Sequence, residues 1–176
     1  DYVNAGSLIH YRCRHREFTR VDFRELYEYL LASGLRFKAV QFDPNITHAE
    51  RPMFEAEARE YYAENYPYID YVGFKGFNYE GGPLEPREMQ SFYIPIHYQE
   101  PIAGNEAAID LDYHSSESRT RAVLALFEKE APSLTDRLNL VKKAGEVSRC
   151  GDHDGPSYGV VLMHPGVPLS ADPDVW

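Results

Sequence analysis

The segment at residues 92–112, FYIPIHYQEPIAGNEAAIDLD, constrains the fold of this chain more than any other stretch. Residues 91–98 are dense in aromatic and β-branched side chains, which suit a pleated and largely buried surface. Pro101 and Gly104 then predict a bend, and residues 107–112 resume an extended apolar pattern. The segment therefore predicts two strands joined by a turn.

The clearest helix is predicted near the N-terminus. Thr19 is its expected N-cap, with Asp22 at the N3 position in a variant of the capping box. Apolar residues follow at helical spacing, and Gly34 stands where a C′ glycine belongs. These signals agree with one another, so the helix is expected to begin just after Thr19 and to end just before Gly34.

Two further helices are predicted from their caps. The capping box Thr47-x-x-Glu50 opens the first, although Pro52 indicates that its first regular turn starts later. Ser115 or Ser116 caps the second. These helices are expected to end near Glu64 and Ala131.

The other apolar runs predict strands, which are residues 35–42, 69–79, 134–141 and 158–164. Within residues 69–79 the glycines predict close approach of another part of the backbone. Strand runs broken by single helices favour an α+β fold over a parallel doubly wound sheet. We expect an antiparallel sheet of five or six strands with helices packed on it.

Composition excludes several classes of protein. At 176 residues with 43% hydrophobic content, the chain can build one domain with a real core. The formal net charge of −10 leaves no basic stripe to neutralise phosphates, so nucleic acid is not the expected partner. No apolar run approaches the roughly 20 residues that span a bilayer, and the chain opens at Asp1 without a charged-then-apolar leader.

Several short motifs follow one another in a recognisable order. They are Tyr93-x-Pro95-Ile96, Glu100-Pro101, Gly104-Asn105-Glu106 and Asp110-x-Asp112, preceded by Phe42-x-Pro44 and Glu50-Arg51-x-x-Phe54-Glu55, and followed by Arg119, Thr135, residues 138–141, residues 159–162 and Pro165. In this order they resemble the CHASE sensory domain, the extracytoplasmic input module of transmembrane histidine kinases and nucleotide cyclases. The resemblance runs from about Phe18 to Pro168, nearly the whole chain.

The resemblance implies a domain plan and a location. Residues 1–34 would form a stalk or N-terminal helical segment, residues 35–168 a PAS-like distal sensor domain, and residues 169–176 an exit tail. The domain would lie on the extracellular or periplasmic face of a membrane, in a parent protein anchored by helices outside this segment. The stalk helix would form the seam of a homodimer, and ligand occupancy would be relayed through it.

The resemblance also implies a ligand cavity. It places Arg119, Thr135 and Met163 around a small molecule of unknown identity. The remaining expected lining residues are Phe74, Phe92, Tyr93, His97, Leu138 and Leu140. With one guanidinium and few carboxylates, such a cavity would prefer a neutral or anionic ligand.

One ligand class is disfavoured by two of these positions. Plant cytokinin receptors of the family recognise adenine through an acidic side chain, and the alignment places Ser118 there. Met163 stands where those receptors carry a hydroxyl residue. Both changes remove polar partners that an adenine edge needs, so a cytokinin is not the expected ligand.

Two alternatives to a sensor remain open at this point. Asp110, Asp112 and His114 share one face of a strand and could bind a divalent metal, which would suit a metal-dependent hydrolase. A purely structural dimerisation module with a filled, dry core is the other. We expect no enzymatic activity and no cofactor, because the chain has no nucleophile elbow, Walker glycine loop or His-Glu-x-x-His helix.

Two further features are weaker signals. Cys13 and Cys150 could form a disulfide in an oxidising compartment, or they could remain free thiols. The acidic loop Asp152-His153-Asp154 lies between glycines, and polar loops of this composition are common without any bound cation.

Overall fold

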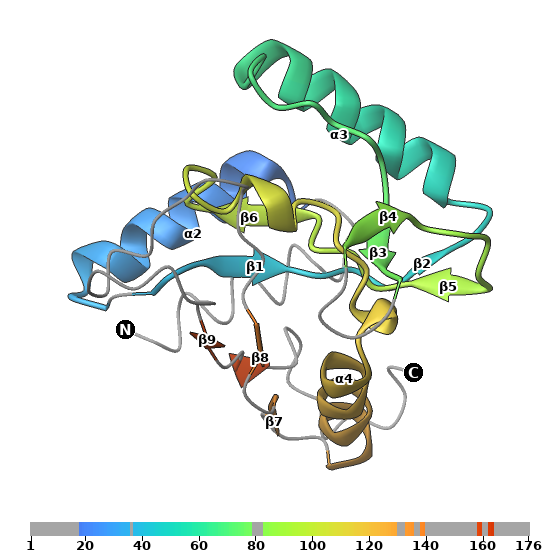
Figure 1. Cartoon of the computed structure of the whole chain (residues 1–176). Helices are drawn as coiled ribbons and strands as arrows, with labels where there is room; N and C mark the ends of the chain where they lie inside the picture. Colours follow the sequence, from blue (N-terminus) through green and yellow to red (C-terminus); the bar gives the residue numbers. More distant parts are fainter. Residues whose placement is uncertain are drawn as a thin grey trace, which may run out of the picture.

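A computed structural model describes residues 18–35, 37–78, 83–129, 133–135, 138–139, 158–159 and 162–163 (Figure 1). Its helices are α2 (Arg20–Ala32), α3 (Arg51–Asn65) and α4 (Glu117–Lys129), with short 3-10 helices η1 (Glu106–Ala108) and η2 (Tyr113–Ser115). Its strands are β1 (Val40–Phe42), β2 (Ile46–Thr47), β3 (Lys75–Phe77), β4 (Leu84–Pro86), β5 (Phe92–Tyr93), β6 (Tyr98–Glu100), β7 (Ser133–Leu134), β8 (Leu138–Asn139), β9 (Tyr158–Gly159) and β10 (Leu162–Met163). The predicted α+β class is confirmed.

The caps of α2 follow the sequence prediction. The Thr19 hydroxyl accepts from the backbone N–H of Asp22, and the Asp22 carboxylate accepts from the backbone N–H of Thr19, which completes the capping box. At the other end Gly34 has a φ of +84° and donates to the carbonyl of Leu31, while Leu35 donates to Leu30. These two bonds form a Schellman motif, which requires the left-handed backbone that glycine allows.

Helix α3 begins where Pro52 permits it. Glu50 reaches back to accept from the backbone N–H and hydroxyl of Thr47, so half of the predicted capping box forms one turn ahead of the helix. Pro52 sits within the first two helical positions, where its missing N–H has no intrahelical role. Ala58 and Tyr62 form the buried face, whereas Met53 is exposed.

The described strands form five antiparallel pairs, β1–β6, β2–β5, β3–β4, β7–β10 and β8–β9. Residues 94–97 and 110–113 connect three of these pairs through backbone bonds. Ile96 donates to Leu111, Asp110 donates to Ile96, and Asp112 donates to Lys75 of β3. The predicted single sheet of five or six strands therefore appears as short pairs around a central link, and its PAS-like character remains a prediction.

Two predicted strands are shorter than expected, for local reasons. Residues 107–112 were expected to be extended, but the first part forms η1, because Asn105 holds the turn by donating to the carbonyls of Pro101 and Lys38. Of residues 69–79, only β3 is a strand, and Gly73 before it has a φ of +89°. The close approach predicted at glycine is confirmed, since a Cβ at Gly76 would lie 2.6 Å from the Cβ of Ser115.

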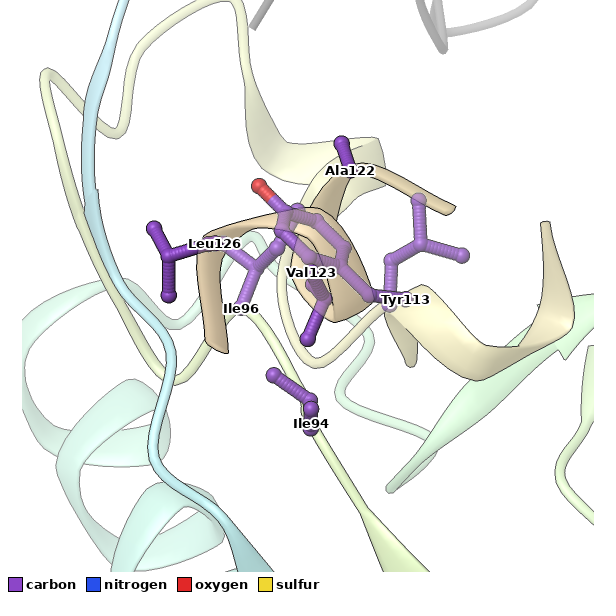
Figure 2. Packing of buried hydrophobic residues seen from close by; sticks show 7 residues of the cluster. Ile94, Ile96, Tyr113, Ala122, Val123 and Leu126 are labelled. Atoms are coloured by element: carbon purple, nitrogen blue, oxygen red, sulfur yellow. The ribbon is translucent and has the colours of Figure 1, made fainter. Parts of the chain in front are cut away.

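The core has two faces, one against α3 and one against α4, which lie on opposite sides of the central strands (Figure 1). Residues 93–97 join β5 to β6, and we call them the central strand. Their side chains alternate between the two faces, as in a strand. Ile94 and Ile96 pack with Leu111, Tyr113 and the buried side of α4, as Figure 2 shows. Tyr93 instead packs with Ile46, Phe74 and the partly buried Phe54 of α3.

Candidate functional site

On the α3 face, His97 is the centre of a buried polar cluster. His97 is 1% exposed, and its Nδ1 lies 3.1 Å from Oδ1 of the fully buried Asp110. Its Nε2 lies 3.1 Å from Oε2 of Glu57. Because both neighbours of the ring are carboxylates, both ring nitrogens must donate, so the imidazole is in its protonated form. The Tyr71 hydroxyl donates to the other Asp110 oxygen at 2.5 Å. We call Arg20, Glu57, Tyr71, His97 and Asp110 the His97 cluster.

Arg20 connects this cluster to the first turn of α2. Its guanidinium makes two bonds to the Glu57 carboxylate, at 3.0 and 3.1 Å, and a 2.8 Å bond to the backbone carbonyl of His97. The rings of Tyr61 and Tyr98 lie 4.7 and 4.6 Å from its central carbon, which gives cation–π contacts. Helix α2 is thereby attached to both α3 and the central strand.

The pKa values of these groups follow from their partners. Burial lowers the pKa of His97, but its bonds to Asp110 and Glu57 outweigh that effect and leave it above the ordinary value. Burial alone would raise the pKa of Glu57, yet bonds from His97 and Arg20 bring it down to about 2. Arg20 and Glu57 are therefore charged at neutral pH, whereas burial and the neighbouring Asp110 raise the pKa of Tyr71 and keep its hydroxyl neutral, and each carboxylate oxygen of Glu57 and Asp110 is bonded.

The residues of the hydrolase alternative serve the fold. Oδ1 of Asp112 accepts from the backbone N–H groups of Ile94 and His114, and Oδ2 accepts from Arg87 at 2.7 Å. Asp110 belongs to the His97 cluster, and the His114 ring packs against Phe92. Among the residues that the structure describes, no group of three or more His, Cys, Asp or Glu side chains is placed to hold a metal ion. The geometry gives the hydrolase no support.

On the α4 face, a second polar group surrounds Asp43, which follows β1. Tyr113 donates to Oε1 of Gln41 at 2.7 Å and also lies within hydrogen-bond reach of the Asp43 carboxyl. Its single proton can satisfy only one of them. The buried Arg119 of α4 stacks over the rings of Tyr113 and Phe77, at 5.9 and 5.3 Å. We call Gln41, Asp43, Tyr113 and Arg119 the Asp43 cluster.

This second cluster is incompletely satisfied. Burial raises the pKa of Asp43 to about 7, against the opposing effects of Tyr113 and the Arg119 charge. Oδ1 of Asp43 and Oγ of Ser118 are sealed from solvent and have no hydrogen-bond partner in the described part of the chain. Native structures usually satisfy such groups, so the sealed Oδ1 of Asp43 indicates a place where a polar partner is missing from the described residues.

The structure separates the expected cavity residues into two sets. Arg119 and Thr135 are buried on the α4 side. Strand β7, which directly precedes Thr135, and strand β10, which contains Met163, both contact α4. On the opposite face, Phe74 and Tyr93 pack edge to face, and His97 belongs to its own cluster. Phe92 is 39% exposed. Leu138 and Met163 are described by backbone alone, and Leu140 lies outside the described residues.

Sequence reasoning missed Asp43 as a candidate site residue. In the sequence it is only the middle residue of the Phe42-x-Pro44 motif, after the strand predicted at residues 35–42. Its partners in the structure are Tyr113 and Arg119, which are 70 or more positions away along the chain. The signal that could have identified Asp43 is an acidic residue in a short connection between apolar strands. The sequence around Gln41 and Tyr113 does not indicate that they are its neighbours. Cys13, Cys150, residues 152–154 and residues 1–17, for which predictions were made from the sequence, lie outside the described residues.

The described helices include none that is both long enough and apolar enough to cross a membrane. A search of curated proteins finds no match to this chain. The family model of the CHASE domain matches residues 16–151. That match covers most of the sequence and contains every residue of both clusters, so the chain belongs to the CHASE domain family of extracytoplasmic sensory domains.

Proposed function

We propose that this domain binds a small molecule in the α4 face and that it is the input domain of a transmembrane receptor, either a histidine kinase or a nucleotide cyclase. The observation that carries the proposal is the Asp43 cluster, in which Oδ1 of Asp43 is sealed from solvent beside Tyr113 and Arg119 and has no hydrogen-bond partner among the described residues, inside a domain of a sensory family. A core with no role in binding would replace these groups with apolar ones, because an unsatisfied buried group costs about 1–3 kcal/mol.

The proposed pocket lies among α4, the segment after β1 and strands β7 and β10. We propose that Arg119 and Thr135, both buried, line it and that Asp43 adds a polar atom. The β7–β10 register sets Met163 opposite Ser133, two residues before Thr135. Phe74, Tyr93 and His97, which were also expected to line the cavity, lie on the opposite face and are not part of this proposed pocket.

The proposed relay passes through α2. Arg20 attaches this helix to Glu57 and to His97 of the central strand, and Arg24 pairs with Glu100 of β6 at 3.0 Å. The central strand presents His97 to the α2 side and Ile96 to the α4 side. A ligand that binds one arrangement of this strand more tightly would therefore also favour one position of α2. The size of the shift is set by the difference between its affinities for the two arrangements.

A ligand screen tests the pocket. A thermal-shift screen of small metabolites, including adenine-type cytokinins, would find stabilising compounds, and isothermal titration would measure their affinity. Thr135→Ile adds bulk and removes a hydroxyl, so we expect it to abolish binding while it barely changes the melting temperature of the unliganded domain. A compound that stabilises the wild-type and Thr135→Ile proteins equally would place its site away from the α4 face.

Location and assembly have their own tests. Alkaline phosphatase fused within the domain of the full-length parent should be active, because the domain is proposed to be outside the cytoplasm. Removal of residues 1–16 should weaken self-association, measured by analytical ultracentrifugation, and should leave the domain folded. A truncated protein that cannot fold would contradict the assignment of these residues to a dimer seam.

A further inference from the structure

The imidazole of His97 joins two carboxylates that differ in their access to solvent. Nδ1 lies 3.1 Å from Oδ1 of Asp110, which is fully buried and whose other oxygen accepts from Tyr71. Nε2 lies 3.1 Å from Oε2 of Glu57, whose side chain is 48% exposed. Both contacts are hydrogen bonds only while each ring nitrogen carries a proton. The loss of one proton must therefore break one of them.

The bond on the buried side is the one that a neutral ring should keep. Without it Asp110 would have only the Tyr71 hydroxyl, whereas water can reach the Glu57 carboxylate. A buried group left without its partner costs about 1–3 kcal/mol, and more when it is charged. The remaining proton is therefore expected on Nδ1. The lone pair of Nε2 then faces Oε2 of Glu57, and two acceptors at this distance repel each other.

Glu57 is also the residue through which α3 holds α2. Its Oε2 accepts from Nη2 of Arg20 at 3.1 Å, and its Oε1 accepts from Nε of Arg20 at 3.0 Å. A Glu57 carboxylate that turns away from a neutral Nε2 disturbs the alignment of this two-point contact. Arg20 keeps its bond to the carbonyl of His97, so the attachment of α2 is weakened without being lost.

We propose that the proton on Nε2 of His97 sets how strongly α2 is attached to α3, so that this domain responds to alkaline pH. The proposal goes beyond ligand binding, because it needs no molecule in the α4 face. It adds a second input to the helix through which the proposed relay passes. With the proton present, α2 and α3 are joined through Glu57, and without it the same contact is weaker.

The partners of His97 set the direction of the response. Burial lowers its pKa, but the bonds to Asp110 and Glu57 outweigh that effect and leave the pKa above 6.5. The proton is therefore present at neutral pH, and it is lost as pH rises through the folded value. The attachment of α2 is thus expected to be strong at neutral pH and weaker at alkaline pH.

The other groups around the ring must be separated from this titration. The titratable or charged groups that face His97 or its carboxylate partners from the packed elements are Arg20, Glu57, Tyr62, Tyr71, Lys75 and Asp110. Burial raises the pKa of both tyrosines. Burial lowers the pKa of Lys75, which lies near Asp110. The experiment therefore has to follow the nitrogens of His97 themselves.

The test uses the whole chain with ¹⁵N-labelled histidine, followed by NMR from pH 6 to pH 10. Both nitrogens of His97 should be protonated at pH 6, and Nε2 alone should lose its proton as pH rises. Over the same range, the protection of residues 20–32 from hydrogen exchange, taken relative to an unstructured chain, should fall about fivefold. The protection of residues 117–129 should stay constant, because α4 has no contact with this proton.

Glu57→Gln makes the test sharper. The glutamine amide can donate to a neutral Nε2, so the neutral ring keeps both partners. The protection of residues 20–32 should then start lower, since the two-point contact with Arg20 is lost, and should no longer depend on the state of His97. Glu60→Gln is the matched control, because it removes a charge from an exposed position of the same helix and should leave the full response.

Four results would overturn the proposal. A ring that is neutral at pH 6, that keeps both protons at pH 10, or that loses the proton of Nδ1 would contradict the role given to Nε2. Constant protection of residues 20–32 while Nε2 loses its proton would show that this proton does not act on α2. An equal loss in residues 117–129 would mean general destabilisation. A full response in Glu57→Gln would exclude Glu57 as the link. No ligand enters the experiment, so these results leave the proposed pocket to its own test.

Discussion

The His97 cluster and the Asp43 cluster contain the same kinds of group and lie on opposite faces of one central strand. Each has an arginine, an aspartate and a tyrosine, and Asp110 is fully buried whereas Asp43 is half-buried with its Oδ1 sealed from solvent. In the first, both oxygens of Asp110 are bonded, and the arginine holds a carboxylate at two points. In the second, one oxygen of Asp43 has no partner in the described residues, and its tyrosine is shared. The first arrangement connects α2, α3 and residues 97–110, and the second leaves one carboxylate oxygen without a partner in the described residues.

The backbone at the two aspartates supports this difference. Asp110 has a φ of +51°, which is uncommon for a residue with a side chain. It is held there by side-chain bonds to His97 and Tyr71 and by a backbone bond from Lys75. Asp43 has neither a positive φ nor a complete set of partners. A fixed network is expected to resist change, whereas an incomplete one is expected to respond to a partner.

Removal of the imidazole should give the largest effect. His97→Ala leaves Asp110 buried with a single tyrosine donor, and the loss of one partner of a buried ion pair typically costs about 3–5 kcal/mol. We expect a loss of this size in the free energy of unfolding, measured by urea denaturation at pH 7. His48→Ala is the control, because His48 is exposed and bonds only to the Tyr93 hydroxyl. A loss below that of His48→Ala would show that the His97 cluster does not stabilise the fold.

Neutralisation of Asp43 should act in the opposite direction. Its pKa is about 7 in the folded state against 3.8 in the unfolded state, so the folded state binds more protons between these values and stability falls as pH rises through them. The asparagine in Asp43→Asn does not titrate, so the stability of this variant lacks that pH dependence. A shift of this size corresponds to about 4 kcal/mol before relaxation, and we expect a gain of about 1–2 kcal/mol at pH 8. Urea denaturation of the wild type and of Asp43→Asn from pH 4 to 8 tests this prediction. The same change of unfolding free energy with pH in both proteins would contradict it.

Weakening of the α2 attachment should give a smaller loss. Arg20→Lys keeps the charge and loses the two-point contact with Glu57, which a lysine cannot reproduce. We expect a loss of about 1 kcal/mol by urea denaturation. Hydrogen exchange should increase in residues 20–32 and stay unchanged in residues 117–129. Equal increases in both helices would show that Arg20 does not act locally on α2.

The pH dependence of the His97 contribution should be the smallest effect. Because the pKa of His97 is raised in the folded state, its stabilisation is complete below the unfolded value of 6.5 and is lost as pH rises through the folded value. The stability difference between wild type and His97→Gln should therefore narrow from pH 6 to pH 9 by about 1 kcal/mol. A difference that widens over this range would reverse the assignment of a protonated ring.

Local signals allowed the helix ends to be predicted accurately. Thr19, Asp22 and Gly34 act within one turn of their own positions, so their roles do not depend on the rest of the fold. Strand lengths were overestimated, because an apolar alternation shows which residues are buried and does not show where pairing stops. Residues 69–73 are an example, since Ile69 and Tyr71 pack against a cluster that contains Ala58 and Tyr62 of α3 but do not join a strand.

The sequence by itself determined the family, the helix caps and the alternation along residues 93–97 that directs neighbouring side chains to opposite faces. Only the tertiary structure decided which face each polar residue serves. Glu57, Arg20 and His97 are separated by up to 77 residues in the chain, and they meet because α2 and α3 pack on the same side. Asp43 was not predicted as a site residue because its partner Arg119 lies on α4, more than 70 positions away. Burial and partner identity are long-range properties, and sequence patterns report mainly local ones.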